Sequence, residues 1–281
     1  MKSTTLNLRG RLIDFDRPKV MGILNVTPDS FYSSSRDYAD EAIVRRVETM
    51  KREGADIVDI GGYSTRPGAP SVSPEEEYSR LSRGLEIVRR HWPEAVVSVD
   101  TFRGSVARRC VAEWEVDIIN DIGGGTLDPD MWPAVAETGA AYILMHMRGT
   151  PQTMQTLTDY EDVAADVISD LAFKCASLRE LGISDVIVDP GFGFAKTVGQ
   201  NYRLFSAIPE IKKLGVPLLA GISHKTMLWK PLGITADEST MPTVALDAVA
   251  LYLGADIVRV HEVLPAVQTV KMLGLLRDNS I

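Results

Sequence analysis

The sequence predicts an α/β fold: a (β/α)8 TIM barrel with an N-terminal β-hairpin plug. Short β-branched strands alternate with amphipathic helical segments, eight such strands can be read, and several of them end in polar residues. Alternation of strands and helices implies a parallel sheet, and eight units favour a closed barrel. The alternative is an open doubly wound sheet. No Gly-x-Gly-x-x-Gly turn follows the first repeated strand, however, which argues against dinucleotide binding.

Length and composition favour one domain that acts on small molecules. The 281 residues suit a single barrel over 1–281, with the hairpin at about 1–18 and the barrel at 19–281. A formal net charge of −8 argues against nucleic-acid binding, although a local basic pocket can still hold a phosphate. Cys110 and Cys175 suit buried free thiols. With no secretory signal and no membrane-spanning apolar run in the sequence, we expect a cytoplasmic protein without a membrane partner.

The elements follow in order from the N-terminus. Residues 5–15 alternate leucine or phenylalanine with polar residues around Gly10, which predicts a hairpin that plugs one end of the core. From Val20 onward, helical segments that end near a glycine alternate with short strands. The predicted strands span 20–25, 57–61, 95–100, 117–121, 141–146, 185–189, 216–221 and 256–261. Amphipathic helices are expected between them, for example over 39–53 and 161–181.

The stretch from Val186 to Phe194 carries the clearest functional signal. A β-branched run ends in Asp189, and a proline and glycines then end the strand. A carboxylate there is unfavourable unless something pairs with it. A helix cap is the simpler interpretation of Asp189 alone, but other predicted strands also end in polar residues, and in a barrel these ends meet at the active-site mouth. The strand-end residues are Asn25, Gly61, Gly62, Thr65, Arg66, Asp100, Asn120, Asp121, His146, Asp189, Ser223, His224, Lys225, Arg259 and His261.

Several of these stretches together resemble the dihydropteroate synthase family. They are Asn-Val-Thr-Pro-Asp-Ser-Phe (25–31), Gly-Gly-Tyr-Ser-Thr-Arg-Pro-Gly (61–68), Ser-Val-Asp-Thr (98–101), Asn-Asp-Ile (120–122), Asp-Pro-Gly-Phe-Gly-Phe (189–194), Gly-Ile-Ser-His-Lys-Thr (221–226) and Arg-Val-His (259–261). They occur in the family's order, and the resemblance covers nearly the whole chain. It implies a barrel, usually a homodimer, that joins a dihydropterin methyl pyrophosphate to p-aminobenzoate and releases pyrophosphate in folate synthesis. Sensitivity to sulfonamide analogues of p-aminobenzoate would follow.

The resemblance implies that polar side chains bind the pterin ring. Asp189 would accept hydrogen bonds from its guanidine-like edge, since a carboxylate can accept a fork of N–H donors. Asn120 offers both a donor and an acceptor, and Asp100 would accept from a ring N–H. Lys225 would donate to the ring carbonyl and nitrogen. For Asp100 and Asn120 the alternative is a structural hydrogen bond that closes a barrel loop.

Apolar and cationic side chains complete the implied site. Met145 and Phe194 can sandwich the ring, although each can equally be ordinary core. Arg259 and His261 lie two residues apart on the last strand, so both can point into the mouth. Arg259 would hold phosphate oxygens in a fixed fork, and His261 would donate to the departing oxyanion. Asn25 resembles the family's ligand for a Mg²⁺ ion that bridges the pyrophosphate.

The implied mechanism is dissociative. Pyrophosphate leaves first, with its charge neutralised by Mg²⁺ and the side chains around it, and the neutral aniline nitrogen then attacks the cationic pterin methylene. No enzyme nucleophile is required, so catalysis consists of positioning and electrostatics. The implied catalytic residues are Asp100, Asp189, Lys225, Arg259 and His261.

The second substrate is expected under two loops, 27–37 and 64–68, which are rich in serine, proline or glycine. Phe31 and Pro67 can grip its benzene ring, and the Thr226 hydroxyl can hold its carboxylate. Plain surface connections are the alternative for both loops. The residues assigned to p-aminobenzoate by the resemblance are Phe31, Thr65, Arg66, Pro67, Lys225 and Thr226.

Three positions depart from the family pattern. His224 stands where an arginine is frequent, Tyr63 where an acidic or amide residue is common, and Ser33 where a second aspartate is usual, with Asp37 nearby.

Three rival functions remain open. A methyltetrahydrofolate-binding methyltransferase domain would share the pterin floor but would not need a pyrophosphate site. An aldolase would use Lys225 as a Schiff-base nucleophile. A non-catalytic pterin-binding protein would keep the fold alone.

Overall fold

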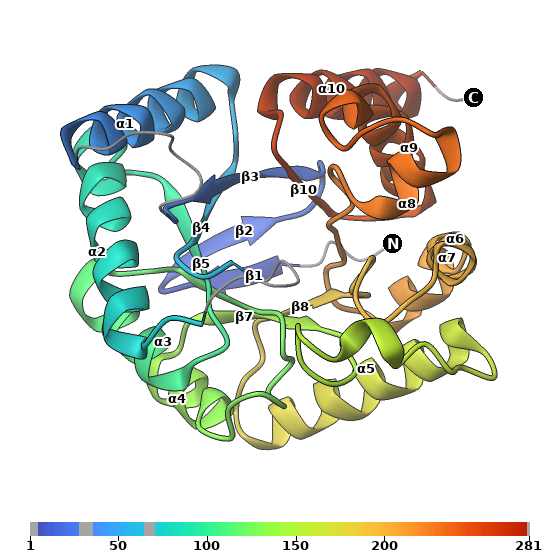
Figure 1. Ribbon diagram of the computed structural model, residues 1–281, viewed down its shortest axis with the longest axis horizontal. Helices are drawn as coiled ribbons and strands as arrows, with labels where there is room; N and C mark the ends of the chain where they lie inside the picture. The colour runs from blue at the N-terminus through green and yellow to red at the C-terminus, as the bar shows by residue number, and fades with distance from the viewer. Residues whose placement is uncertain (1–4, 28–35, 65–70, 280–281) are drawn as a thin grey trace.

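The computed structural model describes residues 5–27, 36–64 and 71–279. Eight parallel strands form one sheet in the order β8-β7-β6-β5-β4-β3-β10-β9, and a bridge between Val188 and Leu218 brings the two end strands together. The predicted TIM barrel is therefore confirmed, and Figure 1 shows the helices arranged around the strands. The strands are β1 (Thr5–Leu8), β2 (Arg11–Asp14), β3 (Lys19–Asn25), β4 (Ile57–Gly61), β5 (Val96–Asp100), β6 (Ile118–Asp121), β7 (Ala141–Met145), β8 (Val186–Asp189), β9 (Leu219–Ala220) and β10 (Ile257–Val260).

Helices follow most of the barrel strands and pack on the outside of the sheet. They are α1 (Arg36–Glu53), α2 (Pro74–His91), α3 (Gly104–Trp114), α4 (Met131–Thr138), α5 (Val163–Glu180), α6 (Val198–Ser206), α7 (Ile208–Ile211), α8 (Thr226–Trp229), α9 (Thr240–Leu253) and α10 (Val263–Asp278). No helix in these parts of the chain is long and apolar enough to cross a membrane. The helices predicted at 39–53 and 161–181 correspond to α1 and α5.

Local sequence explains why these helices start where they do. Ser73 caps α2 by accepting a hydrogen bond from the backbone of Glu76, and Pro74 occupies the first helical turn. Thr197 and Gln200 form a reciprocal capping box at the start of α6. These caps satisfy backbone N–H groups that have no partner within the helix, which fixes the points where the chain leaves the barrel mouth.

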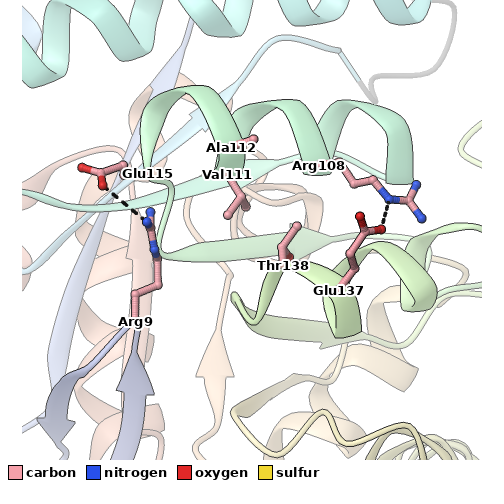
Figure 2. A pocket seen from close by; sticks show the side chains of 7 residues that line it. All are labelled: Arg9, Arg108, Val111, Ala112, Glu115, Glu137 and Thr138. Carbon is pink, nitrogen blue, oxygen red and sulfur yellow. Dashed lines mark hydrogen bonds and ion pairs between the residues drawn. The ribbon is translucent and has the colours of Figure 1, made fainter.

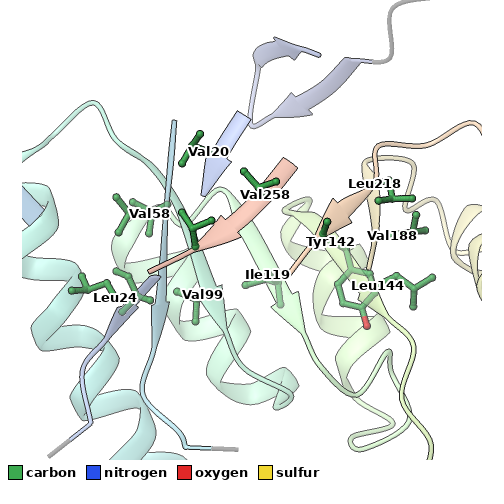
Figure 3. Close-up of a cluster of buried hydrophobic side chains, with 14 of the residues drawn as sticks. Val20, Leu24, Val58, Val99, Ile119, Tyr142, Leu144, Val188, Leu218 and Val258 are labelled. Carbon is green, nitrogen blue, oxygen red and sulfur yellow. The ribbon is translucent and has the colours of Figure 1, made fainter. Parts of the chain in front are cut away.

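The main core lies between the sheet and the helices. Alternate strand residues such as Val58, Val99, Ile119 and Val258 face outward and are fully or almost fully buried, as Figure 3 shows. Because the inward-facing residues are buried as well, the strands read as nearly continuous apolar runs. The polar residues that interrupt these runs on the inner face therefore need a specific explanation.

The hairpin of β1 and β2 covers the amino-terminal end of the barrel, as predicted. Leu6 and Leu8 pack against a ring of inward-facing residues at the start of the barrel strands, including Met21, Ile57 and Ile257. In Figure 1 the two strands lie across the middle of the barrel. Because apolar side chains fill this end, the active site is expected at the opposite, carboxyl-terminal end.

The observed strand bounds agree with the predicted ones to within about two residues, except at β9. There the predicted strand 216–221 shortens to Leu219–Ala220. Pro217 has no backbone N–H and takes part only as an acceptor, from the N–H of Val188. This missing donor, together with the Leu218 N–H that donates to Oδ2 of Asp256 instead of to a neighbouring strand, shortens the start of β9.

A shallow cleft of about 370 Å³ lies beside the hairpin, between its turn and helices α3 and α4 (Figure 2). Arg9 pairs with Glu115 at 3.4 Å, and Arg108 pairs with Glu137 at 2.7 Å. Both cations already have carboxylate partners at this surface. We therefore assign this cleft no ligand.

Candidate active site

A cleft of about 1350 Å³ opens at the carboxyl-terminal end of the barrel. Its lining includes every predicted site residue that the structure describes, namely Asn25, Asp100, Asn120, Met145, Asp189, Phe194, Lys225, Thr226, Arg259 and His261. Phe31, Thr65, Arg66 and Pro67 lie outside the described residues, as does Ser33. The structure thus brings together the residues predicted for pterin and pyrophosphate, and of those predicted for p-aminobenzoate it places Lys225 and Thr226.

Strand register explains how residues distant in sequence meet on one side of the cleft. Asn25 pairs with Gly61, Gly61 with Asp100, and Asp100 with Asn120 across β3, β4, β5 and β6. These positions form one row at the ends of adjacent strands. A Cβ atom on Gly61 would lie 3.4 Å from Oδ1 of Asn25, so the glycine keeps the space between Asn25 and Asp100 open.

Asp189 is buried at the end of β8, where the following loop fixes its orientation. Its Oδ1 accepts the backbone N–H of Gly191 at 2.7 Å. Gly191 has φ +69°, and a Cβ atom there would lie 2.0 Å from the carbonyl oxygen of His146, so only glycine fits this turn. Burial raises the pKa of Asp189, while Lys225 opposes that shift. Because Oδ1 is engaged by the loop, Oδ2 is the oxygen available to a ligand.

Lys225 reaches the cleft from the residue before α8. Its Nζ donates to the carbonyl of Phe192 at 2.5 Å and lies 4.8 Å from the centre of the Phe194 ring. Burial lowers the pKa of Lys225 to about 8, partly offset by Asp189. The ammonium therefore lies beside an aromatic face and near a carboxylate, an arrangement suited to a flat polar heterocycle.

Arg259 on β10 is held between two carboxylates. Its Nε donates to Oδ2 of Asp59 at 2.6 Å, and its Nη2 donates to Oδ2 of Asp100 at 2.9 Å. Burial works against its charge, but Asp59 and Asp100 together raise the pKa of Arg259. Burial also raises the pKa of Asp100 to about 7, despite the opposing effect of Arg259. The guanidinium is thus a fixed cation whose plane is set before any phosphate binds.

Asp59 was not predicted from the sequence. It is fully buried in the middle of β4, and its Oδ2 also accepts from Nδ2 of Asn120 at 3.1 Å. Its Oδ1 and the Oγ of the neighbouring Ser98 have no hydrogen-bond partner among the described residues. The available signal was a carboxylate with apolar neighbours on both sides in the strand Ile57–Gly61, because a charge in such a strand needs a partner from elsewhere.

His261 is held at the rim by contacts from three directions. Its Nδ1 lies 2.9 Å from Oγ of Ser223, and its backbone carbonyl accepts from Arg46. The His224 ring meets the His261 ring edge-on at 5.1 Å. His224 adopts φ +54° and places Nε2 2.9 Å from the Glu262 carboxylate. Where the family often has arginine, this chain thus has an imidazole that packs against the predicted leaving-group histidine.

Two polar strand ends do not line the cleft, contrary to the expectation that they would converge there. Asp121 accepts from the Tyr142 hydroxyl at 2.6 Å and from two glycine N–H groups, so it closes its own loop. His146 is buried with Nδ1 3.1 Å from Nζ of Lys196. Lys196 also donates to the carbonyls of Gly191 and Phe194 at 3.0 Å, which supports the Asp189 loop from behind. Both polar ends are structural for this reason.

The predicted metal ligand and the predicted carboxylate-binding residue both lie at the edge of the cleft. Asn25 ends β3 and offers an amide oxygen. Across the described ranges, no group of three or more His, Cys, Asp or Glu side chains is arranged to hold a metal ion. A single amide oxygen of this kind suits Mg²⁺, which often uses one protein ligand together with substrate phosphate and water. Thr226 is exposed at the first residue of α8.

Comparisons with known proteins identify the family of the chain. The family described as pterin binding enzyme matches residues 21–261. A dihydropteroate synthase from Synechocystis sp. is 41% identical over 263 residues, covering 92% of this chain and 90% of that protein. The dihydropteroate synthase of Escherichia coli (strain K12) is 38% identical over 267 residues, covering 94% of each chain.

Solved structures give the same result. Xanthomonas albilineans dihydropteroate synthase, in complex with indole-2-carboxylic acid and 6-chloroguanine, has a TM-score of 0.90 at 34% identity and covers 99% of this chain and 100% of that one. The enzyme from that organism in complex with 7,8-dihydropteroate has a TM-score of 0.86 at 32% identity, with 98% and 100% covered. Because the family match spans most of the chain and these relatives align along nearly their whole length, the chain belongs to the pterin-binding enzyme family and, within it, to the dihydropteroate synthases.

Proposed function

We propose that this protein joins 6-hydroxymethyl-7,8-dihydropterin pyrophosphate to p-aminobenzoate, giving 7,8-dihydropteroate and pyrophosphate in folate synthesis. The observation that carries the proposal is the pairing of two kinds of site in one cleft. Asp189, Asn120 and Lys225 form a polar floor for a heterocycle, and Arg259 and His261 stand at the neighbouring strand end. A methyltransferase domain that binds a reduced folate would need the floor but not the pyrophosphate site of Arg259 and His261.

The floor matches the edges of a pterin. Oδ2 of Asp189 accepts from the guanidine-like edge, where an amino group and a ring N–H lie side by side. Lys225 donates to the ring carbonyl and nitrogen, and Phe194 and Met145 cover the two faces of the ring. Asn120 adds an amide acceptor, because its amide nitrogen is already bonded to Asp59. Together these contacts hold the pterin with its methylene group toward Arg259.

Departure of pyrophosphate needs positive charge and a donor at the leaving oxygen. Arg259 supplies a fixed cation, and His261 donates a hydrogen bond to the oxyanion that forms. The carboxylates of Asp100 and Asp189 stabilise the cationic methylene left behind. The aniline nitrogen then attacks and loses its proton to solvent. Each step relies on groups oriented before substrate arrives, so no covalent enzyme intermediate is formed.

Mg²⁺ is proposed as the cofactor, with Asn25 as its ligand from this chain. A bound Mg²⁺ would neutralise the charge of the pyrophosphate oxygens. Asn25 would contribute its amide oxygen to the ion. The chemistry of the donor set supports this role, because a neutral amide leaves the ion its full charge for the substrate.

The second substrate is proposed to bind above the pterin, toward the surface. The hydroxyl of Thr226 would hold the benzoate carboxylate, with Lys225 beneath the ring. Phe31, Thr65, Arg66 and Pro67 would complete this subsite by resemblance to the family. Sulfonamide analogues of p-aminobenzoate would compete there.

We further propose that the protein is a cytoplasmic homodimer formed through α9 and α10. These helices expose large apolar side chains, among them Met241, Tyr252, Met272 and Leu275, and an exposed apolar face of this kind favours a protein partner. Tyr252→Glu should shift the molecular mass measured by light scattering from dimer to monomer. A dimer that persists in this variant would place the interface elsewhere.

The free thiols of Cys110 and Cys175 suit a reducing compartment, which cell fractionation can check.

The decisive test of function is turnover by the purified protein with Mg²⁺, the dihydropterin pyrophosphate and p-aminobenzoate. We expect pyrophosphate release that requires both substrates and is matched by an equal amount of dihydropteroate. An Arg259→Met variant should lose turnover. Saturable pterin binding without any product would instead favour a non-catalytic binder.

A further inference from the structure

We propose that Asp59 is a positioning residue that couples the pterin and pyrophosphate subsites through a single carboxylate oxygen. Oδ2 of Asp59 accepts from Nε of Arg259 at 2.6 Å and from Nδ2 of Asn120 at 3.1 Å. Asp59 is fully buried and does not line the cleft, so it acts on substrates only through these two residues. The inference rests on the proposed function, because it assigns the two subsites as that function does.

The barrel interior makes this shared contact possible. Asp59 lies at the centre of β4, while Asn120 and Arg259 come from β6 and β10, each two strands away in the sheet. On the intervening strand β5, the register partner of Asp59 is Ser98, whose side chain is small. Asn120 can therefore reach this carboxylate across β5, whereas the longer side chain of Arg259 reaches it across β3, where Ile23 is the register partner of Asp59.

The contact fixes the orientation of the Asn120 amide. An amide can often be turned over without a visible change in shape, so its oxygen and nitrogen must be assigned from their partners. Oδ2 of Asp59 already accepts from Nε of Arg259, so the amide atom that faces it is the donor, Nδ2. Oδ1 of Asn120 then faces the cleft. At this position the site is set to accept a hydrogen bond from the ligand, which favours a heterocycle edge with an N–H or amino group.

The same oxygen fixes the Arg259 fork. With Nε held by Asp59 and Nη2 by Asp100, the guanidinium cannot rotate about its last bonds without breaking a charged hydrogen bond. A group held in place before binding loses less entropy when it meets pyrophosphate. A change at Asp59 should therefore weaken both the pterin and the pyrophosphate contacts, although neither ligand touches it.

The test is calorimetric titration of wild type and Asp59→Asn with two separate probes, 6-hydroxymethylpterin and inorganic pyrophosphate with Mg²⁺. Asparagine keeps the shape, and its single oxygen can still accept from both donors, but the negative charge is lost from both hydrogen bonds. Loss of one charged hydrogen bond predicts Kd values about 10- to 100-fold higher for each probe. Asp247→Asn is the matched control: a buried carboxyl in α9, away from the cleft, whose Oδ1 has no hydrogen-bond partner within the described ranges.

A second comparison separates positioning from a general structural effect. If Asp59 acts on the pterin through Asn120, then in an Asn120→Ala background the Asp59→Asn change should no longer raise the Kd for the pterin probe. It should still raise the Kd for pyrophosphate, which depends on Arg259. Additive losses for the pterin would overturn the inference, because they would show that Asp59 acts by another route.

Hydrogen exchange on the wild-type protein gives a test that needs no variant of Asp59. The side-chain amide protons of Asn120, assigned by their loss in Asn120→Ala, should be protected from exchange in the free protein. Rapid exchange would overturn the inference. A wild-type protein that binds neither probe would contradict the proposed function and this inference with it. Normal wild-type binding with unchanged affinities in Asp59→Asn would contradict the inference alone.

Discussion

Asp189→Asn removes the charge at the centre of the proposed pterin floor while keeping the size of the side chain. In the wild-type protein, Oδ1 accepts the N–H of Gly191 at 2.7 Å, which leaves Oδ2 for the ligand. The loop N–H needs an acceptor at this position, because in the wild-type protein Oδ1 of Asp189 is its partner. Asparagine must therefore keep its oxygen toward the loop and turn its NH₂ group toward the N–H donors of the pterin.

This geometry sets the magnitude. The change removes at least one charge-assisted hydrogen bond, at about 1.5–3 kcal/mol each, and places a donor against a donor. We expect pterin binding to weaken by about 3 kcal/mol, roughly 100-fold in Kd. The KM for p-aminobenzoate at saturating pterin pyrophosphate should change by less than about threefold, because the proposed carboxylate contact at Thr226 is separate from Asp189.

Calorimetry with 6-hydroxymethylpterin measures the first quantity, and initial rates measure the second. Asp185→Asn is the matched control. It lies just before the same strand at the opposite end of the barrel, where it accepts the N–H of Asn7, a role that an asparagine oxygen can keep. A variant at Asp189 that binds pterin as tightly as wild type would refute the role assigned to this carboxylate.

Three further outcomes follow from the charges in and around the cleft. Burial raises the pKa of Asp100 to about 7, so kcat/KM should rise as the pH increases through 7 and the carboxylate forms, and Asp100→Asn should remove that limb of the pH profile. Burial opposes protonation of His224, but the Ala236 carbonyl and Glu262 outweigh it and raise its pKa. The stabilisation from this pair should thus be present below the unfolded pKa of about 6.5 and be lost as the pH rises through the folded value, so the Tm difference between wild type and Glu262→Gln should shrink at high pH. Borohydride with carbonyl substrates should trap no adduct on Lys225, whereas a covalent adduct detected by mass spectrometry would support imine chemistry.

The fold could be predicted well because its signals are local. Strands that end in proline or glycine, and helices with a clear apolar face, identify their own boundaries within a few residues. The strand at β9 was the exception, because its hydrogen bonds depend on which backbone groups of the neighbouring strands are within reach. The sequence shows only part of this, through Pro217, which has no N–H to donate.

The cleft was predicted through its strand ends, but its internal connections were not. Nothing in the sequence states that Asp59 and Arg259, 200 positions apart, share a hydrogen bond. Likewise His146 and Asp121 read as site residues because they end strands, although both are engaged behind the cleft by Lys196 and Tyr142. Strand position says where a residue lies, but the partner it meets depends on side chains from other strands.

The most direct test of the account is a crystal structure of the protein with 6-hydroxymethyl-7,8-dihydropterin pyrophosphate. The account predicts the pterin edge on Oδ2 of Asp189, with Lys225 on its carbonyl, the amide oxygen of Asn120 turned toward the ring, and the pyrophosphate against Arg259 and His261. A pterin bound elsewhere, or bound with its pyrophosphate directed away from β10, would contradict it.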